Sequence, residues 1–136
     1  MARIGRVLET SLYVDDLARA RKFYERHFDL RVLHADARMC AYAAGDTVLL
    51  LFQRREGLTP VEMPHGSIPP HDGDGPLHVA FAIDADDLTI WEDELAESGV
   101  PIEGRVRWPR GGQSIYFRDP DGHLIELATP GLWANY

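Results

Sequence analysis

The sequence predicts an α+β fold made of two βαβββ modules that form a common cleft. The main observation is that one order of patterns (strand, helix, strand, strand, strand) occurs twice along the 136 residues. The junctions between the first strand and the helix also correspond, because Glu9 lies seven residues before Asp16 and His78 lies nine before Asp87. Such a repeat indicates a duplicated unit whose sheet carries a helix on one face and needs its partner to cover the other.

The first module is expected to span residues 5–54 of a single domain covering 1–136. Residues 7–14 alternate and are rich in β-forming side chains, which is typical of a strand. Asp15 or Asp16 can cap the helix that follows, expected over about 16–27, with Phe23 on its core stripe. Gly45-Asp46 provides a turn. The remaining strands of this module are expected at 30–35, 38–44 and 47–53.

A stretch rich in proline and glycine, residues 55–76, separates the modules and is expected to be a linker or a lid with exposed histidines His65 and His71. The second module follows over 77–130. Asp86 or Asp87 caps its helix, Trp91 is expected in the core, and Ser98-Gly99 ends the helix. Strands are expected at 77–83, 101–107, 113–118 and 123–128, with a turn at 119–122.

Composition narrows the function classes. The net charge of −8 argues against general binding to nucleic acid, and no apolar run approaches the ~20 residues that span a bilayer. We expect no signal peptide, and the single cysteine, Cys40, excludes an internal disulfide framework and is expected to be a half-buried strand residue. A cytoplasmic protein is therefore predicted, without nucleic-acid or membrane partners.

Three side chains stand out inside apolar strands: Glu9, expected in the middle of its strand, His78 and Glu126. Each alone could be an ordinary residue, a carboxylate facing solvent or a satisfied core histidine. A carboxylate inside such a strand is costly to bury unless it is paired or ligated. Together, one nitrogen and two carboxylates suit a divalent ion and leave positions open for water and substrate.

Three segments, ETSLYVDDLARARKFYERHFDL, LHVAFAI and SIYFRDPDGHLIELATPG, resemble the vicinal oxygen chelate superfamily, which includes glyoxalase I, fosfomycin-resistance thiol transferases, extradiol dioxygenases and bleomycin-resistance proteins. The resemblance implies the glyoxalase fold, a homodimer, and Glu9, His78 and Glu126 as ligands of Mn, Fe, Ni, Co or Zn. Glu9 departs from the His or Gln that is commoner at its position. Leu49, Leu50 and Leu51 stand where glyoxalase I has a fourth ligand, a glutamate.

The segments HVAFAI and GGQSIYFRDPDGH, with the final Glu126, are most similar to the fosfomycin-resistance enzymes. This similarity implies that Ser114 and Tyr116 approach the substrate or a monovalent cation, and that Glu126 and Tyr116 serve catalysis. Ser11 could line the pocket. Arg118 could bind substrate or pair with Asp119 or Asp121, and His123 belongs to the turn signature as a structural residue. The tail ATPGLWANY lacks the basic residue that those enzymes use against the phosphonate.

Two functions remain open. The first is a metal-dependent enzyme acting on a small oxygen-chelating substrate as a lyase, isomerase or thiol transferase; a dioxygenase is the weaker branch because only one histidine is in the ligand set. The alternative is a metal-free protein of the bleomycin-resistance type, with Glu9 and Glu126 lining a cleft for a cationic drug. Neither the substrate nor the pairing of modules, within one chain or exchanged in the dimer, follows from the sequence.

Overall fold

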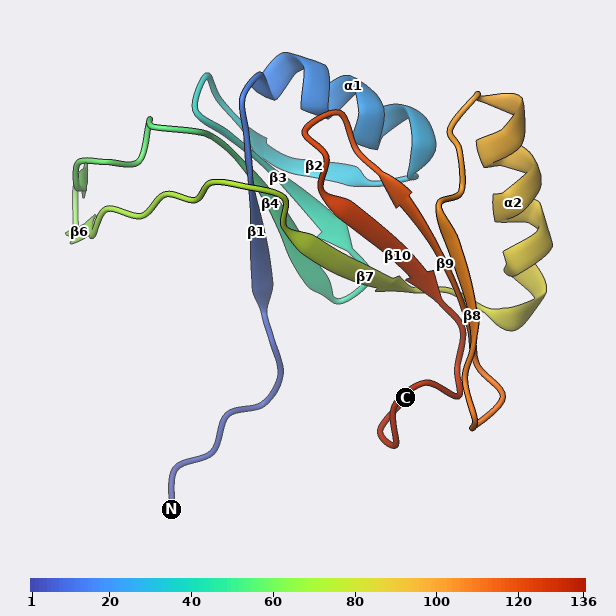
Figure 1. Cartoon of the computed structure of the whole chain (residues 1–136). Coiled ribbons are helices and arrows are strands. Elements are labelled where there is room, and N and C mark those ends of the chain that lie inside the picture. The colour runs from blue at the N-terminus through green and yellow to red at the C-terminus, as the bar shows by residue number, and fades with distance from the viewer. The chain divides into compact units, whose positions relative to one another are not determined.

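Each half of the chain folds as a four-stranded mixed sheet accompanied by a helix, in a computed structural model that describes residues 1–136 (Figure 1). The chain divides into two compact units, residues 1–75 and 76–136. Both units follow the order strand, helix, strand, strand, strand. The predicted α+β class with two βαβββ modules is therefore confirmed, whereas the grouping of the two units into one domain stays a prediction.

The first unit contains one sheet with the order β1-β4-β3-β2. Strand β1 runs parallel to β4, and the other neighbours are antiparallel. All four strands and the helix begin within two residues of their predicted starts. The elements are β1 Glu9–Val14, α1 Leu17–His27, β2 Arg31–Ala35, β3 Met39–Ala44 and β4 Thr47–Gln53.

Helix α1 begins where its sequence supplies a cap. Asp16 has an extended backbone, and its carboxylate accepts a hydrogen bond from the Arg19 N–H at 3.1 Å. The helix buries Leu17, Ala20 and Tyr24, which recur at helical spacing. Phe23 lies beside this stripe and is only half-buried, so its predicted place in the core is wrong.

Removing the cap gives a first testable prediction. Asp16→Ala should lower the free energy of unfolding by about 1 kcal/mol, because an N–H of the first helical turn loses its acceptor. Urea unfolding followed by circular dichroism measures the loss. Asp29→Ala, an exposed aspartate just beyond the other end of the helix, is the control and should change little. Equal stability of the two variants would contradict the capping role.

The core of the first unit lies on one face of its sheet. Leu12, Leu51 and Cys40 are register neighbours across β1, β4 and β3, and each is at most 1% exposed. Cys40 is thus fully buried, not half-buried as expected. The alternate residues of β1, including Glu9 and Ser11, lie on the opposite face because successive side chains of a strand alternate.

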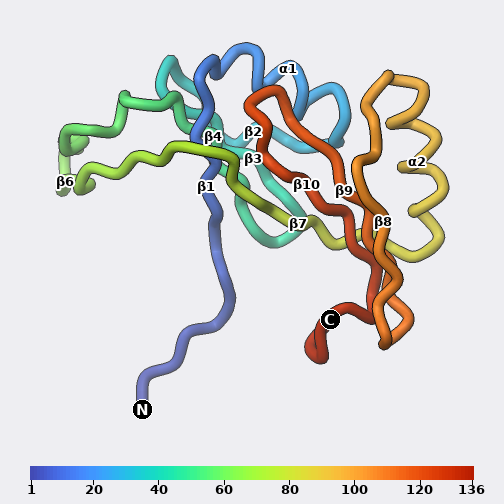
Figure 2. Tube along the Cα trace, viewed as in Figure 1, coloured from blue at the N-terminus to red at the C-terminus, as the bar shows by residue number.

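The segment 55–76, expected to be a linker or a lid, contains a small hairpin of β5 Val61–Met63 and β6 Gly66–Ile68. In the tube this hairpin lies where the segment turns back toward the first sheet (Figure 2). The chain then returns to the sheet. The Tyr13 hydroxyl and His71 Nδ1 are 2.7 Å apart, and a methyl group on Gly73 would lie 2.4 Å from the Tyr13 ring. His71 remains exposed, as expected.

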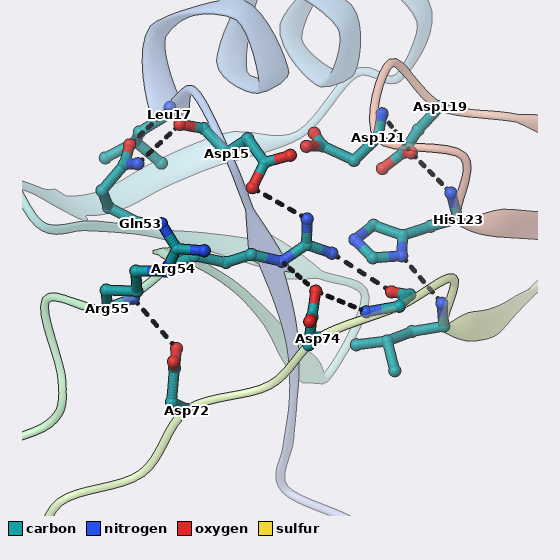
Figure 3. Close-up of polar contacts among 12 residues, drawn as sticks. Asp15, Leu17, Gln53, Arg54, Arg55, Asp72, Asp74, Asp119, Asp121 and His123 are labelled. Carbon is teal, nitrogen blue, oxygen red and sulfur yellow. Dashed lines mark hydrogen bonds and ion pairs between the residues drawn. The ribbon is translucent and has the colours of Figure 1, made fainter.

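Polar contacts fix both ends of this segment (Figure 3). Arg54 pairs with Asp15 at 2.9 Å and donates to the Gly75 carbonyl at 3.1 Å, and the Arg55 N–H donates to Asp72. At the end of β4, Gln53 accepts from the Leu17 N–H and donates to the Asp15 carbonyl, which joins the strand to the start of α1.

The second unit repeats the arrangement with the order β7-β10-β9-β8, in which β10 is parallel to β7. Helix α2 buries Leu88 and Leu95, whereas Trp91 is half-buried, which corrects its expected place in the core. None of the helices has the length and apolar character needed to cross a membrane. The elements are β7 His78–Ala82, the short 3₁₀ helix η1 Ala85–Asp87, α2 Leu88–Glu97, β8 Gly104–Arg107, β9 Gln113–Arg118 and β10 Leu124–Ala128.

The turn between β9 and β10 is held by Asp119 and His123 (Figure 3). One Asp119 oxygen accepts from the backbone N–H groups of Asp121 and His123 at 3.0 and 2.8 Å. His123 is fully buried, and its Nδ1 accepts from the Leu77 N–H at 2.8 Å. The histidine of the turn therefore has the structural role that the sequence predicts.

Candidate functional site

The polar centre of the second unit lies on the sheet face opposite α2. Leu127, Ile115 and Arg105 form one row across β10, β9 and β8, and Arg105 contacts Glu92 of α2 at 3.4 Å, so this row faces the helix. Glu126 directly precedes Leu127 in β10, and the row of Glu126 contains Tyr116 and Ala80. Alternation along the strands therefore places Glu126 and Tyr116 on the other face.

Glu126 and His78 form the centre of this site. His78 Nε2 lies 3.3 Å from Glu126 Oε1, and Glu126 is only 5% exposed. His78 Nδ1 lies 2.9 Å from the Leu124 carbonyl oxygen, which can only accept a hydrogen bond, so Nδ1 carries the proton. In the neutral imidazole, Nε2 then presents a lone pair beside a carboxylate oxygen.

Two acceptor atoms facing one another suit a cation. A histidine that ligates a metal characteristically donates its other ring N–H to a carbonyl or carboxylate, as His78 does here. One imidazole nitrogen and one carboxylate oxygen are ligands accepted by several divalent transition metals. The donor set of the second unit therefore fits part of a divalent-metal site.

Ser114 and Trp108 support Glu126 from the side. The Ser114 hydroxyl donates to Glu126 Oε2 at 2.6 Å, and the Trp108 indole N–H donates to Ser114 Oγ at 2.8 Å. Ser114 is 1% exposed. The sequence reasoning missed Trp108, because no residue pattern links the end of β8 with a side chain six positions further along.

Tyr116 is half-buried in the same row as Glu126, and its ring centre is 6.4 Å from that of His78. Burial, and next the negative charge of Glu126, raise the pKa of Tyr116 above its ordinary value. The side chain thus stays a neutral phenol at physiological pH and keeps its ability to donate a hydrogen bond.

Arg118 is engaged differently from the expectation. Its Nε donates to Glu103 at 2.6 Å and its Nη1 donates to the Gly122 carbonyl. The expectation that Arg118 pairs with Asp119 or Asp121 is therefore wrong. The side chain remains 44% exposed. Its register row contains Leu124 and His78, which puts Arg118 on the face of the candidate site.

Glu9 and Ser11 lie in the first unit. Glu9 is the first residue of β1 and exposed, which corrects its expected place in the middle of the strand, and Ser11 is half-buried two residues further on. Within each unit, no group of three or more His, Cys, Asp or Glu side chains is close enough to hold a metal ion. Glu9 as a third ligand beside His78 and Glu126 therefore stays a prediction.

Comparison with known proteins agrees with this fold. The model of the Glyoxalase/Bleomycin resistance protein/Dioxygenase superfamily, which is the vicinal oxygen chelate superfamily, matches residues 3–127. The chain belongs to this superfamily, as its motifs predicted.

The chain is similar in sequence and in structure to particular members of this superfamily. The chain is 36% identical to the metallothiol transferase FosB of Bacillus licheniformis over 121 residues, which are 88% of this chain and 72% of the relative. The crystal structure of lactoylglutathione lyase from Agrobacterium tumefaciens is similar with a TM-score of 0.87, 30% identity, and coverage of 98% of this chain and 99% of that one. The fosfomycin resistance protein FosX of Mesorhizobium loti has a TM-score of 0.62 and 28% identity, with coverage of 94% and 93%.

Proposed function

We propose that this chain is a divalent-metal-dependent vicinal oxygen chelate enzyme of the thiol-transferase or lyase type, acting on a small oxygen-chelating substrate. The observation that carries the proposal is the pair of His78 Nε2 and Glu126 Oε1, which lie 3.3 Å apart. The other polar atom of each side chain is already hydrogen-bonded, His78 Nδ1 to the Leu124 carbonyl and Glu126 Oε2 to the Ser114 hydroxyl. The relatives named metallothiol transferase and lactoylglutathione lyase support this class of activity.

In this proposal His78 and Glu126 hold the ion, and Glu9 supplies the third ligand. The ion is Mn, Fe, Ni, Co or Zn, and when bound it acts as a Lewis acid on the substrate oxygens. Ser114 keeps Glu126 in one orientation. Tyr116 remains a phenol and donates a hydrogen bond toward the negative charge that develops on the substrate, while Ser11 and Arg118 contribute to substrate binding.

Strand β4 favours thiol transfer over glyoxalase chemistry. The resemblance to glyoxalase I implies a fourth ligand, a glutamate, on this strand, but the chain has Leu49, Leu50 and Leu51 there. Leu49 and Leu51 are fully buried in the core, and Leu50 shares the row of Ser11. No carboxylate of β4 can therefore join the metal.

The assembly and cellular location belong to the same proposal. We infer a homodimer, because the superfamily resemblance implies it, and a cytoplasmic location, in keeping with a single buried cysteine. Sedimentation equilibrium measures the first, with a mass of about twice 15.3 kDa expected.

The test begins with the metal content of the purified protein and with melting curves in Mn²⁺, Fe²⁺, Ni²⁺, Co²⁺ and Zn²⁺. We expect about one ion per chain and a rise in melting temperature. An ion at 100 times its dissociation constant stabilises the folded state by about 2.7 kcal/mol. At this chain length that is a shift of about 10 °C.

The loaded protein is then assayed for thiol consumption with fosfomycin and L-cysteine or glutathione, and for conversion of methylglyoxal with glutathione. Thiol-dependent turnover would support the transferase type, and turnover of the methylglyoxal adduct the lyase type. Absence of both metal and thermal shift would contradict the proposal and favour the metal-free binding protein, with Glu126 as an anionic residue of its cleft.

A further inference from the structure

A chain of hydrogen bonds in the second unit runs from Trp108 through Ser114 to Glu126. We propose that Trp108 is a positioning residue, which orients the Glu126 carboxylate through Ser114 and withdraws the Ser114 hydroxyl from the substrate. The inference rests on the proposed function in one respect, because the oriented carboxylate is the one assigned to the metal.

The direction of each hydrogen bond is fixed by chemistry. An indole N–H can only donate, so Ser114 Oγ is the acceptor from Trp108. The single hydroxyl hydrogen of Ser114 then goes to Glu126 Oε2, and the short distance of 2.6 Å is typical of a bond from a hydroxyl to a carboxylate. With its hydrogen committed, and at 1% exposure, Ser114 has no donor left to offer a substrate.

The turn that carries Trp108 is itself held in place. The Trp108 N–H donates to the Gly112 carbonyl at 2.8 Å, and the Gly111 N–H donates back to the Trp108 carbonyl at 2.9 Å. Gly112 packs directly on Gly131, because a methyl group on Gly112 would lie 2.6 Å from the Gly131 carbonyl carbon. The indole is therefore presented from a closed turn that is packed against the C-terminal loop.

This arrangement gives the two oxygens of Glu126 separate tasks. Oε2 accepts from Ser114, whereas Oε1 points toward His78 Nε2. Because the carboxylate is already held in one orientation, it presents one defined oxygen to a cation and loses little side-chain entropy when the ion binds. Partners of this kind, one step removed from the metal, typically contribute a factor of about 10 to 100 in metal affinity.

The arrangement also bears on which side chains can contact a substrate. The resemblance to fosfomycin-resistance enzymes implies a substrate contact at the position of Ser114, but here that hydroxyl is committed to Glu126. The Ser114 hydroxyl hydrogen is therefore not available to a substrate, which departs from what the resemblance implies.

The experiment compares Trp108→Phe with Trp91→Phe, which removes a half-buried indole from α2 as the matched control. Metal affinity is measured by titration with Ni²⁺ and Mn²⁺. Trp108→Phe should weaken binding about tenfold and Trp91→Phe should not. Ser114→Ala should weaken it at least as much, and adding Trp108→Phe to Ser114→Ala should cost little more, because the two residues act in series.

A second measurement needs neither metal nor a Trp108 variant that folds. In the metal-free protein labelled with ¹⁵N, the Trp108 indole N–H resonance, assigned through its loss in Trp108→Phe or by sequential connectivity, should shift in both Ser114→Ala and Glu126→Gln. The Trp91 and Trp133 resonances should not shift.

The outcomes separate the inference from the proposed function. If the unaltered protein binds metal but Trp108→Phe binds it as well as Trp91→Phe, the inference is overturned and the proposed function stands. If the unaltered protein binds no metal, the proposed function fails, and the indole resonance decides the inference. An unmoved Trp108 resonance in Glu126→Gln would overturn it, and a shifted one supports the orientation of Glu126.

Discussion

Replacing His78 with alanine is expected to weaken binding of the divalent ion by more than about 100-fold while the second unit stays folded. The loss should exceed the 10- to 100-fold effect typical of removing a residue that hydrogen-bonds to a ligand, because this change removes a ligand itself. The cost in stability should be small. The His78 side chain is 50% exposed on the edge strand β7, and the backbone pairing of β7 with β10 does not depend on it.

Glu126→Ala should abolish tight binding as well, but with a different effect on stability. Glu126 is buried, so its removal leaves the Ser114 hydroxyl without its acceptor and should cost about 1–3 kcal/mol. Glu9→Gln should be milder than either, because an amide oxygen can still ligate. This order of effects distinguishes a metal site from a site that uses only the negative charges of Glu9 and Glu126, where Glu9→Gln would weaken binding and His78→Ala would not.

Metal content by mass spectrometry and the thermal shift with each ion measure these changes. His34→Ala is the matched control, since His34 Nε2 lies 3.0 Å from Asp36 Oδ2 and is likewise a histidine beside a carboxylate, but on the exposed strand β2. The control should keep the full metal content. Stoichiometric metal in both His78→Ala and Glu126→Ala would show that the site lies elsewhere.

Much of the fold follows from local signals in the sequence. The helix start at Leu17 follows from Asp16, and the turn at Gly45, with φ +60°, follows from its glycine. The strands follow from alternation that the burial reproduces, as in Leu12 and Val14 against Ser11 and Tyr13. These features depend on residues a few positions apart, which is why one sequence is enough to predict them.

Features that depend on distant residues escaped prediction. Arg118 pairs with Glu103, fifteen residues away across the sheet, and not with the nearer Asp119 or Asp121. The hairpin at 61–68 forms in a stretch whose prolines and glycines indicate only irregular chain. In the site, the motifs drew attention to Ser114 and Glu126 but did not show that they are hydrogen-bonded to one another or that Trp108 donates to Ser114, because these contacts join residues six and twelve positions apart.

His123→Ala should lower the free energy of unfolding by about 3 kcal/mol, the largest stability effect expected here. The side chain is fully buried, so its loss leaves a cavity, and the Leu77 N–H loses its acceptor at the same time. The expected fall in melting temperature is about 10 °C. His65→Ala, an exposed histidine in the turn between β5 and β6, should change it little.

The conservative variant His123→Asn separates the two causes. An asparagine Oδ1 can take the place of the imidazole Nδ1 and accept from the Leu77 N–H, although it fills less of the cavity. It should therefore recover a measurable part of the loss, whereas His123→Leu, which fills the space but cannot accept, should not. Because Leu77 precedes His78, and the carbonyl of Leu124 accepts from His78 Nδ1, the same turn also sets the ligand's orientation. Metal affinity should follow the same order, with His123→Asn above His123→Leu; the reverse order would show that packing alone, and not the hydrogen bond, positions His78.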